Sequence, residues 1–76
     1  MKIVRLESVS FVGAYFVLYP VGGGLQVVPL VHFPPLQNQL RERETWELHD
    51  EGTRIHWPEL EYSLTVPELL KVSLPL

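Results

Sequence analysis

The residues best suited to chemistry lie in two short segments of the second half of the chain. The segments WELH (46–49) and RIHW (54–57) hold two of the three histidines beside acidic and basic neighbours. Imidazole and carboxylate groups can bind a divalent metal, or act together as general acid and base. The candidate polar surface site consists of Glu47, His49, Arg54, His56 and Glu59.

Metal binding and catalysis compete with a purely structural interpretation of these residues. A zinc site needs three or four converging ligands, and the sequence has no helical H-x-x-x-H spacing. A catalytic pair such as His56 with Glu47 or Glu59 needs a pocket, for which a thin core leaves little depth. We therefore expect exposed cross-strand pairs, Glu47–His56 and His49–Arg54, with no catalytic residue, metal or cofactor.

The pattern around these residues predicts a β-hairpin. Both segments alternate apolar and polar residues with period two, and residues 50–53 (DEGT) form the turn between them. This loop pairs 49 with 54, 48 with 55, 47 with 56 and 46 with 57. The apolar face then consists of Trp46, Leu48, Ile55 and Trp57. We expect this face to build the core, in preference to a ligand-stacking platform.

The remaining elements complete a small α+β fold. Residues 2–12, 14–21 and 25–30 read as strands, and the glycines at 22–24 form a hairpin turn. No helix or lysine follows these glycines, so they do not indicate a phosphate site. The segment 32–36 should be extended and 59–64 a polar connection, with short helices near 38–45 and 66–72. We expect a single domain, 1–76, with a small antiparallel sheet of about five strands in two hairpins, a short central helix and a C-terminal helix.

Composition narrows the classes of protein to which the chain can belong. It has 76 residues, no cysteine and a net charge of -3. Disulfides and thiolate chemistry are therefore excluded, and a general nucleic-acid clamp is disfavoured. Arg41 and Arg43 alternate with glutamates, which cancels their field. No secretory signal or membrane-spanning run is visible, so a cytoplasmic location is the default expectation.

The first predicted hairpin is apolar on both faces. One face can be covered by the helices and the tryptophan hairpin, but no element remains to cover the other. An exposed apolar surface of this kind marks an interface. The predicted partner interface consists of Tyr15, Val17, Tyr19, Val21, Leu25 and Val27. We expect a two-fold homodimer, with a small heterologous protein partner encoded nearby as the alternative.

The second half also resembles a known family. The pattern runs from Phe33-Pro34-Pro35-Leu36 through Trp46-Glu47-Leu48, Gly52 and Ile55-His56-Trp57-Pro58-Glu59-Leu60 to Thr65-Val66 and Leu69-Leu70. It is similar to the bacterial domain-of-unknown-function family 2442, whose members show W-E-L, G-x-x-I-H-W-P-x-L and S-V-x-x-L-L in this order. The resemblance covers Phe33 to Leu70, about half of the chain.

The resemblance implies a small α+β fold and no established reaction. Family members carry an acidic triplet after the W-P-x-L element, where this chain has Glu61, Tyr62 and Ser63. Such domains occur alone, beside helix-turn-helix segments, or next to small toxin-like proteins. The resemblance therefore suggests a small bacterial protein that acts as a non-catalytic interaction module, with a regulatory or antitoxin-like role. The alternatives are a nucleic-acid-binding transcriptional regulator, or a small metal-binding protein or enzyme that uses His56.

Overall fold

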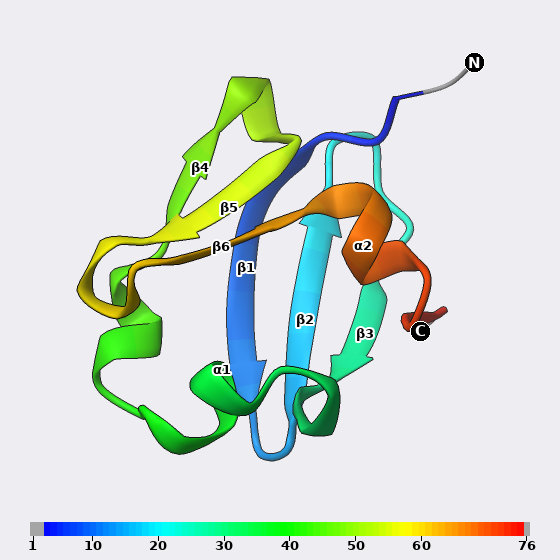
Figure 1. The fold of residues 1–76 in the computed structure, drawn as a ribbon. Helices are drawn as coiled ribbons and strands as arrows, with labels where there is room; N and C mark the ends of the chain where they lie inside the picture. The colour runs from blue at the N-terminus through cyan, green and yellow to red at the C-terminus, as the bar shows by residue number, and fades with distance from the viewer. Residues whose placement is uncertain (1–2, 76) are drawn as a thin grey trace.

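Two antiparallel sheets form the fold of the computed structural model, which describes residues 3–75. The first sheet has the order β1 (Leu6–Val12), β2 (Tyr15–Pro20), β3 (Gln26–Pro29), β7 (Leu74–Pro75). The second has the order β4 (Glu47–His49), β5 (Arg54–Trp57), β6 (Tyr62–Thr65). Figure 1 shows β5 and β6 crossing over one face of the first sheet.

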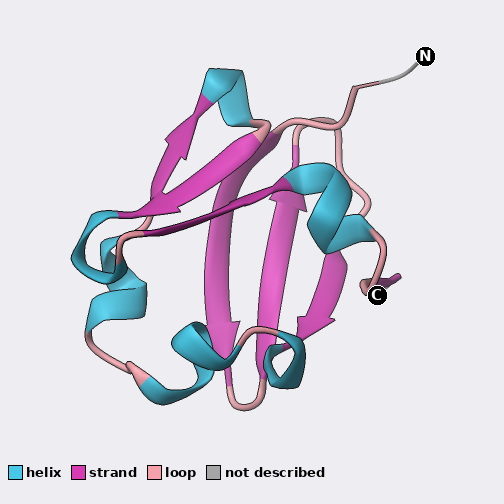
Figure 2. Ribbon diagram, viewed as in Figure 1, coloured by secondary structure: helices cyan, strands magenta, loops and turns pink. Residues whose placement is uncertain are grey.

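The helices are short and lie around the sheets (Figure 2). The two α-helices, α1 (Pro34–Asn38) and α2 (Val66–Leu70), have five residues each. Four 3₁₀ turns are η1 (Leu30–His32), η2 (Glu42–Thr45), η3 (Asp50–Gly52) and η4 (Pro58–Leu60). No helix within the described range is long and apolar enough to cross a membrane.

The first hairpins follow the predicted pattern. β2 and β3 pair with Phe16 opposite Val28 and Val17 opposite Val27. The loop between them contains the glycine triplet at 22–24, where φ is 92°, 96° and 81°. Side chains with a Cβ rarely adopt these left-handed angles, so glycine is required to turn the chain here. The predicted hairpin turn is confirmed.

The second predicted hairpin is also confirmed, in three of its four predicted pairs. The predicted pair of Trp46 with Trp57 is not part of the ladder, because β4 begins at Glu47. Glu47 lies opposite His56, Leu48 opposite Ile55, and His49 opposite Arg54. The expected polar connection over 59–64 is wrong, because β6 adds a third strand to this sheet. Leu64 alternates with polar neighbours and pairs with Ile55, which extends the apolar face by one strand.

The core lies between the two sheets. The inner face of the first sheet contributes Phe16 and Leu18, and the second sheet contributes Ile55 and Trp57, all fully buried. The Trp57 ring lies near Phe16 and Tyr62, with centroids 5.9 and 6.0 Å away. Its Nε1 donates a hydrogen bond to the Arg43 carbonyl oxygen at 2.9 Å. The prediction that Trp57 belongs to the core is confirmed.

The central region differs from its prediction. The segment at 32–36 was expected to be extended, but α1 begins within it, at Pro34. The central helix was expected to begin near residue 38, where α1 instead ends at Asn38. Two prolines fit the first turn of α1 because the N–H groups there need no helical partner. The expected helix near 38–45 is reduced to η2. The fold is α+β, but its seven strands form two sheets and not one sheet of about five.

The C-terminal helix begins with a capping box. The Thr65 Oγ1 accepts a hydrogen bond from the Glu68 N–H at 3.4 Å, and the Glu68 carboxylate accepts from the Thr65 N–H at 2.9 Å. These bonds satisfy N–H groups that the first turn leaves without helical partners. The helix is shorter than expected and ends at Leu70.

Candidate functional site

The polar face is the outer surface of the second sheet. Strand alternation and register place six side chains on it: Glu47, His49, Arg54, His56, Ser63 and Thr65. The side-chain partners differ from those expected. Glu47 Oε1 contacts Nε2 of His49 on its own strand at 3.0 Å, and not His56 across the ladder. Arg54 Nε donates to Asp50 Oδ2 at 2.9 Å, and not to His49.

The two histidines of the polar face contact each other edge to face. Their ring centroids are 5.4 Å apart, and the Nδ1 atom of His56 is buried without a hydrogen-bond partner among the described residues. Glu59 lies apart on η4, exposed, and makes no hydrogen bond or ion pair within residues 3–75. In that same range, no group of three or more His, Asp or Glu side chains is placed to hold a metal ion.

Two titratable groups near this sheet have shifted pKa values. Burial raises the pKa of the Tyr62 phenol, and the negative charge of Glu68 adds to the effect. The hydrogen bond from the Thr65 backbone N–H lowers the pKa of Glu68, and the Thr65 hydroxyl lowers it further. Glu68 belongs to the capping box of α2, whereas Tyr62 lies on β6 opposite Trp57.

The outer face of the first sheet has the opposite character. We define the apolar outer face by the side chains that strand alternation directs away from the core: Ser8, Ser10, Val12, Tyr15, Val17, Tyr19, Val27, Pro29 and Leu74. None of these nine is charged, but the exposed Glu7, at the register shift of β1, lies beside Ser8 and Tyr19 at the margin of the face. Val12 is 60% exposed, Tyr15 47% and Leu74 56%. One polar contact joins the Ser10 hydroxyl and the Tyr19 hydroxyl at 2.9 Å.

Four of the six predicted interface residues lie on this face: Tyr15, Val17, Tyr19 and Val27. Val21 and Leu25 lie in the loop beyond the ends of β2 and β3, where strand alternation no longer applies. Sequence reasoning missed Val12, although it ends the alternating pattern of β1. It also missed the pairing of Leu74 with Val27, which joins distant parts of the chain and has no local signal.

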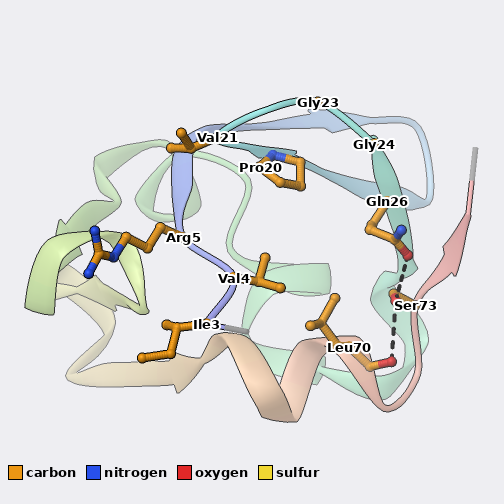
Figure 3. A pocket seen from close by; sticks show the side chains of 10 residues that line it. All are labelled: Ile3, Val4, Arg5, Pro20, Val21, Gly23, Gly24, Gln26, Leu70 and Ser73. Atoms are coloured by element: carbon orange, nitrogen blue, oxygen red, sulfur yellow. Dashed lines mark hydrogen bonds between the residues drawn. The ribbon is translucent and has the colours of Figure 1, made fainter. Parts of the chain in front are cut away.

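Two hollows border the glycine loop. The larger, of about 740 Å³, is shown in Figure 3 and lies between the N-terminal segment, the glycine loop and the end of α2. The smaller, of about 400 Å³, opens on the other side of Pro20, beside Tyr19 and Leu25. Neither of these two hollows is lined by a residue of the polar face.

Comparison with known proteins adds no relative to this description: no family model, no curated protein and no solved structure matches the chain.

Proposed function

We propose that this chain is a non-catalytic protein-interaction module that binds its partner through the apolar outer face. The observation that carries the proposal is the contrast between the two outer surfaces. An antiparallel sheet with one face in water normally alternates apolar and polar residues. The second sheet does so, with a polar outer face, whereas the first sheet directs uncharged and mainly apolar side chains outward.

The size of the face indicates a reversible association. Strands of seven, six, four and two residues, with a rise of about 3.4 Å per residue and a spacing of about 4.8 Å, give a flat area of roughly 300 Å². Stable interfaces bury about 800 Å² on each partner. The face alone therefore supports a weak complex, and residues at its margin such as Val21, 62% exposed, would have to contribute to a tight one.

The absence of charge favours a second copy of this chain as the partner. Two copies of a protein with a net charge of -3 repel each other weakly, but a neutral face adds no repulsion where they meet. A two-fold axis would bring the same residues together from both copies. The alternative partner is a small protein encoded nearby. A bacterial, regulatory or antitoxin-like role rests on the resemblance to domain-of-unknown-function family 2442.

Nucleic-acid binding finds less support. Arg43 is used inside the fold, where its Nη1 donates to the Leu36 carbonyl oxygen at 3.0 Å. Arg5 and Arg54 contact Glu51 and Asp50. Cations already paired with carboxylates offer little attraction to phosphate groups.

The oligomeric state of the purified chain tests the proposal. We expect a concentration-dependent dimer by sedimentation at micromolar concentrations and above. Val27→Lys places a charge within the face and should shift the chain to monomer, whereas Ser63→Lys on the polar face should not. A chain that stays monomeric at every concentration, and that does not bind the product of the neighbouring reading frame, would contradict the proposal.

A further inference from the structure

The larger hollow has an apolar floor built from three distant segments. Figure 3 shows Val4, Pro20 and Leu70 directed into it from the N-terminal segment, from the end of β2 and from α2. Pro20 is buried and the other two are half-buried. A volume of about 740 Å³ is within the range of small-molecule sites. The hollow can therefore accept an apolar body.

Polar groups lie at the margin of this hollow. On one side the Ser73 hydroxyl donates to Gln26 Oε1 at 3.0 Å and lies 3.3 Å from the Leu70 carbonyl oxygen. These groups satisfy one another, and Figure 3 shows them beside the apolar floor. They make that side of the mouth polar without supplying a charge.

Arg5 supplies the one charge among the ten residues that line the hollow, and none of the ten is acidic. The guanidinium is turned toward Glu51, 3.2 Å away, and both side chains are largely exposed, at 52% and 79%. An exposed pair of this kind contributes little, so Arg5 can turn to a ligand at low cost.

The ligand class follows from this combination. A single guanidinium matches one carboxylate, with which it forms two parallel hydrogen bonds. Among the ten lining residues, a phosphate group with a second negative charge would find no second cation, and an amine would be repelled by Arg5. We propose that the hollow binds a small carboxylate with an aliphatic or aromatic body, which rests on Val4, Pro20 and Leu70 while its carboxylate meets Arg5 at the mouth. None of the ten lining residues is among the nine that define the apolar outer face, although Val21 lies at the margin of both. The proposal does not depend on the proposed interaction function.

Titration with three six-carbon probes, followed by backbone amide NMR of the full chain, tests the proposal. Hexanoate should shift the amides of Gly23, Gly24, Gln26 and Ser73. Hexanol should bind more weakly at the same place, and hexylamine more weakly still. Arg5→Gln should weaken the binding of hexanoate by about tenfold, which corresponds to the loss of one charge-assisted hydrogen bond. The affinity for hexanol should not change.

Arg41→Gln is the matched control, because Arg41 is exposed and lines neither hollow. It should leave hexanoate binding as it is. The proposal is overturned if hexanol binds as tightly as hexanoate in the unaltered chain, if Arg5→Gln and Arg41→Gln behave alike, or if the shifted amides lie on the apolar outer face. The comparison of probes needs no variant, so the test does not depend on the folding of a mutant.

Discussion

Replacing Trp57 by alanine should remove a large part of the stability of this protein. The side chain is fully buried, and its Nε1 donates to the Arg43 carbonyl oxygen at 2.9 Å. Truncation of a buried tryptophan costs about 3–5 kcal/mol, because apolar burial is lost and a cavity remains. A domain of 76 residues has a free energy of unfolding of roughly 4–11 kcal/mol. We therefore expect Trp57→Ala to be mostly unfolded, or to unfold at a much lower urea concentration.

Urea unfolding followed by far-ultraviolet circular dichroism measures this effect without relying on tryptophan fluorescence. Trp57→Phe keeps a ring in the core and loses the hydrogen bond to Arg43, so it should cost about 1–3 kcal/mol and remain measurable. Trp46→Ala is the control, because Trp46 is only half-buried, and it should cost less than Trp57→Ala. If Trp57→Ala unfolded within about 1 kcal/mol of the parent, the core described above would be wrong.

Two further predictions concern backbone geometry and pH. Gly52→Ala should destabilise the protein by about 2–4 kcal/mol, because φ is 88° and the new Cβ would lie 2.5 Å from the Leu6 carbonyl oxygen. In the control, Gly23→Ala, φ is 96° but the new Cβ would meet no atom within 4 Å. Urea unfolding should therefore show only the cost of the backbone strain for this control, about 1–2 kcal/mol. Hydrogen bonds to Thr65 lower the pKa of Glu68 in the folded state. The ionised Glu68 therefore stabilises the fold fully at any pH above the pKa that Glu68 has in the unfolded chain. This stabilisation is lost as the pH falls through the pKa that Glu68 has in the folded state. Thermal unfolding from neutral to acidic pH should therefore show a smaller acid-dependent loss for Glu68→Gln than for the parent; an equal loss would contradict this assignment.

Local patterns predicted the second hairpin well, but not its side-chain contacts. Alternation and a four-residue turn determine the register, because a slip by one residue would turn Leu48 and Ile55 outward. Two histidines lie next to Glu47 on this face: His49 on the same strand and His56 on the opposite strand. Which of them it contacts depends on rotamers that residue types do not specify. The sequence therefore predicted that the four polar residues of the hairpin share one face, but not how they pair, nor that Ser63 and Thr65 of β6 join them while Glu59 lies apart.

The errors have two physical sources. In Tyr62–Thr65 the alternation is present, but four residues give a weak signal and the preceding residue, Glu61, adopts a left-handed φ of 49°. Pro34 and Pro35 were read as extended, although prolines also fit the first turn of a helix. The division into two sheets was missed for another reason. It depends on how distant segments pack, which alternation within each segment does not report.

Arg43 connects three parts of the fold that share no sheet. Its Nη1 bonds to Leu36 of α1, its guanidinium lies 4.6 Å from the centre of the Phe11 ring, and its carbonyl accepts from Trp57. The exposed residues around it, including Leu40 at 64%, bury little apolar surface. The segment between α1 and β4 is thus attached by these bonds of Arg43, by the half-buried Trp46 against the core, and by contacts of η2 with η4 and β5. Its amide protons should exchange with solvent as a cooperative unit, at a lower free energy of opening than the strands it covers.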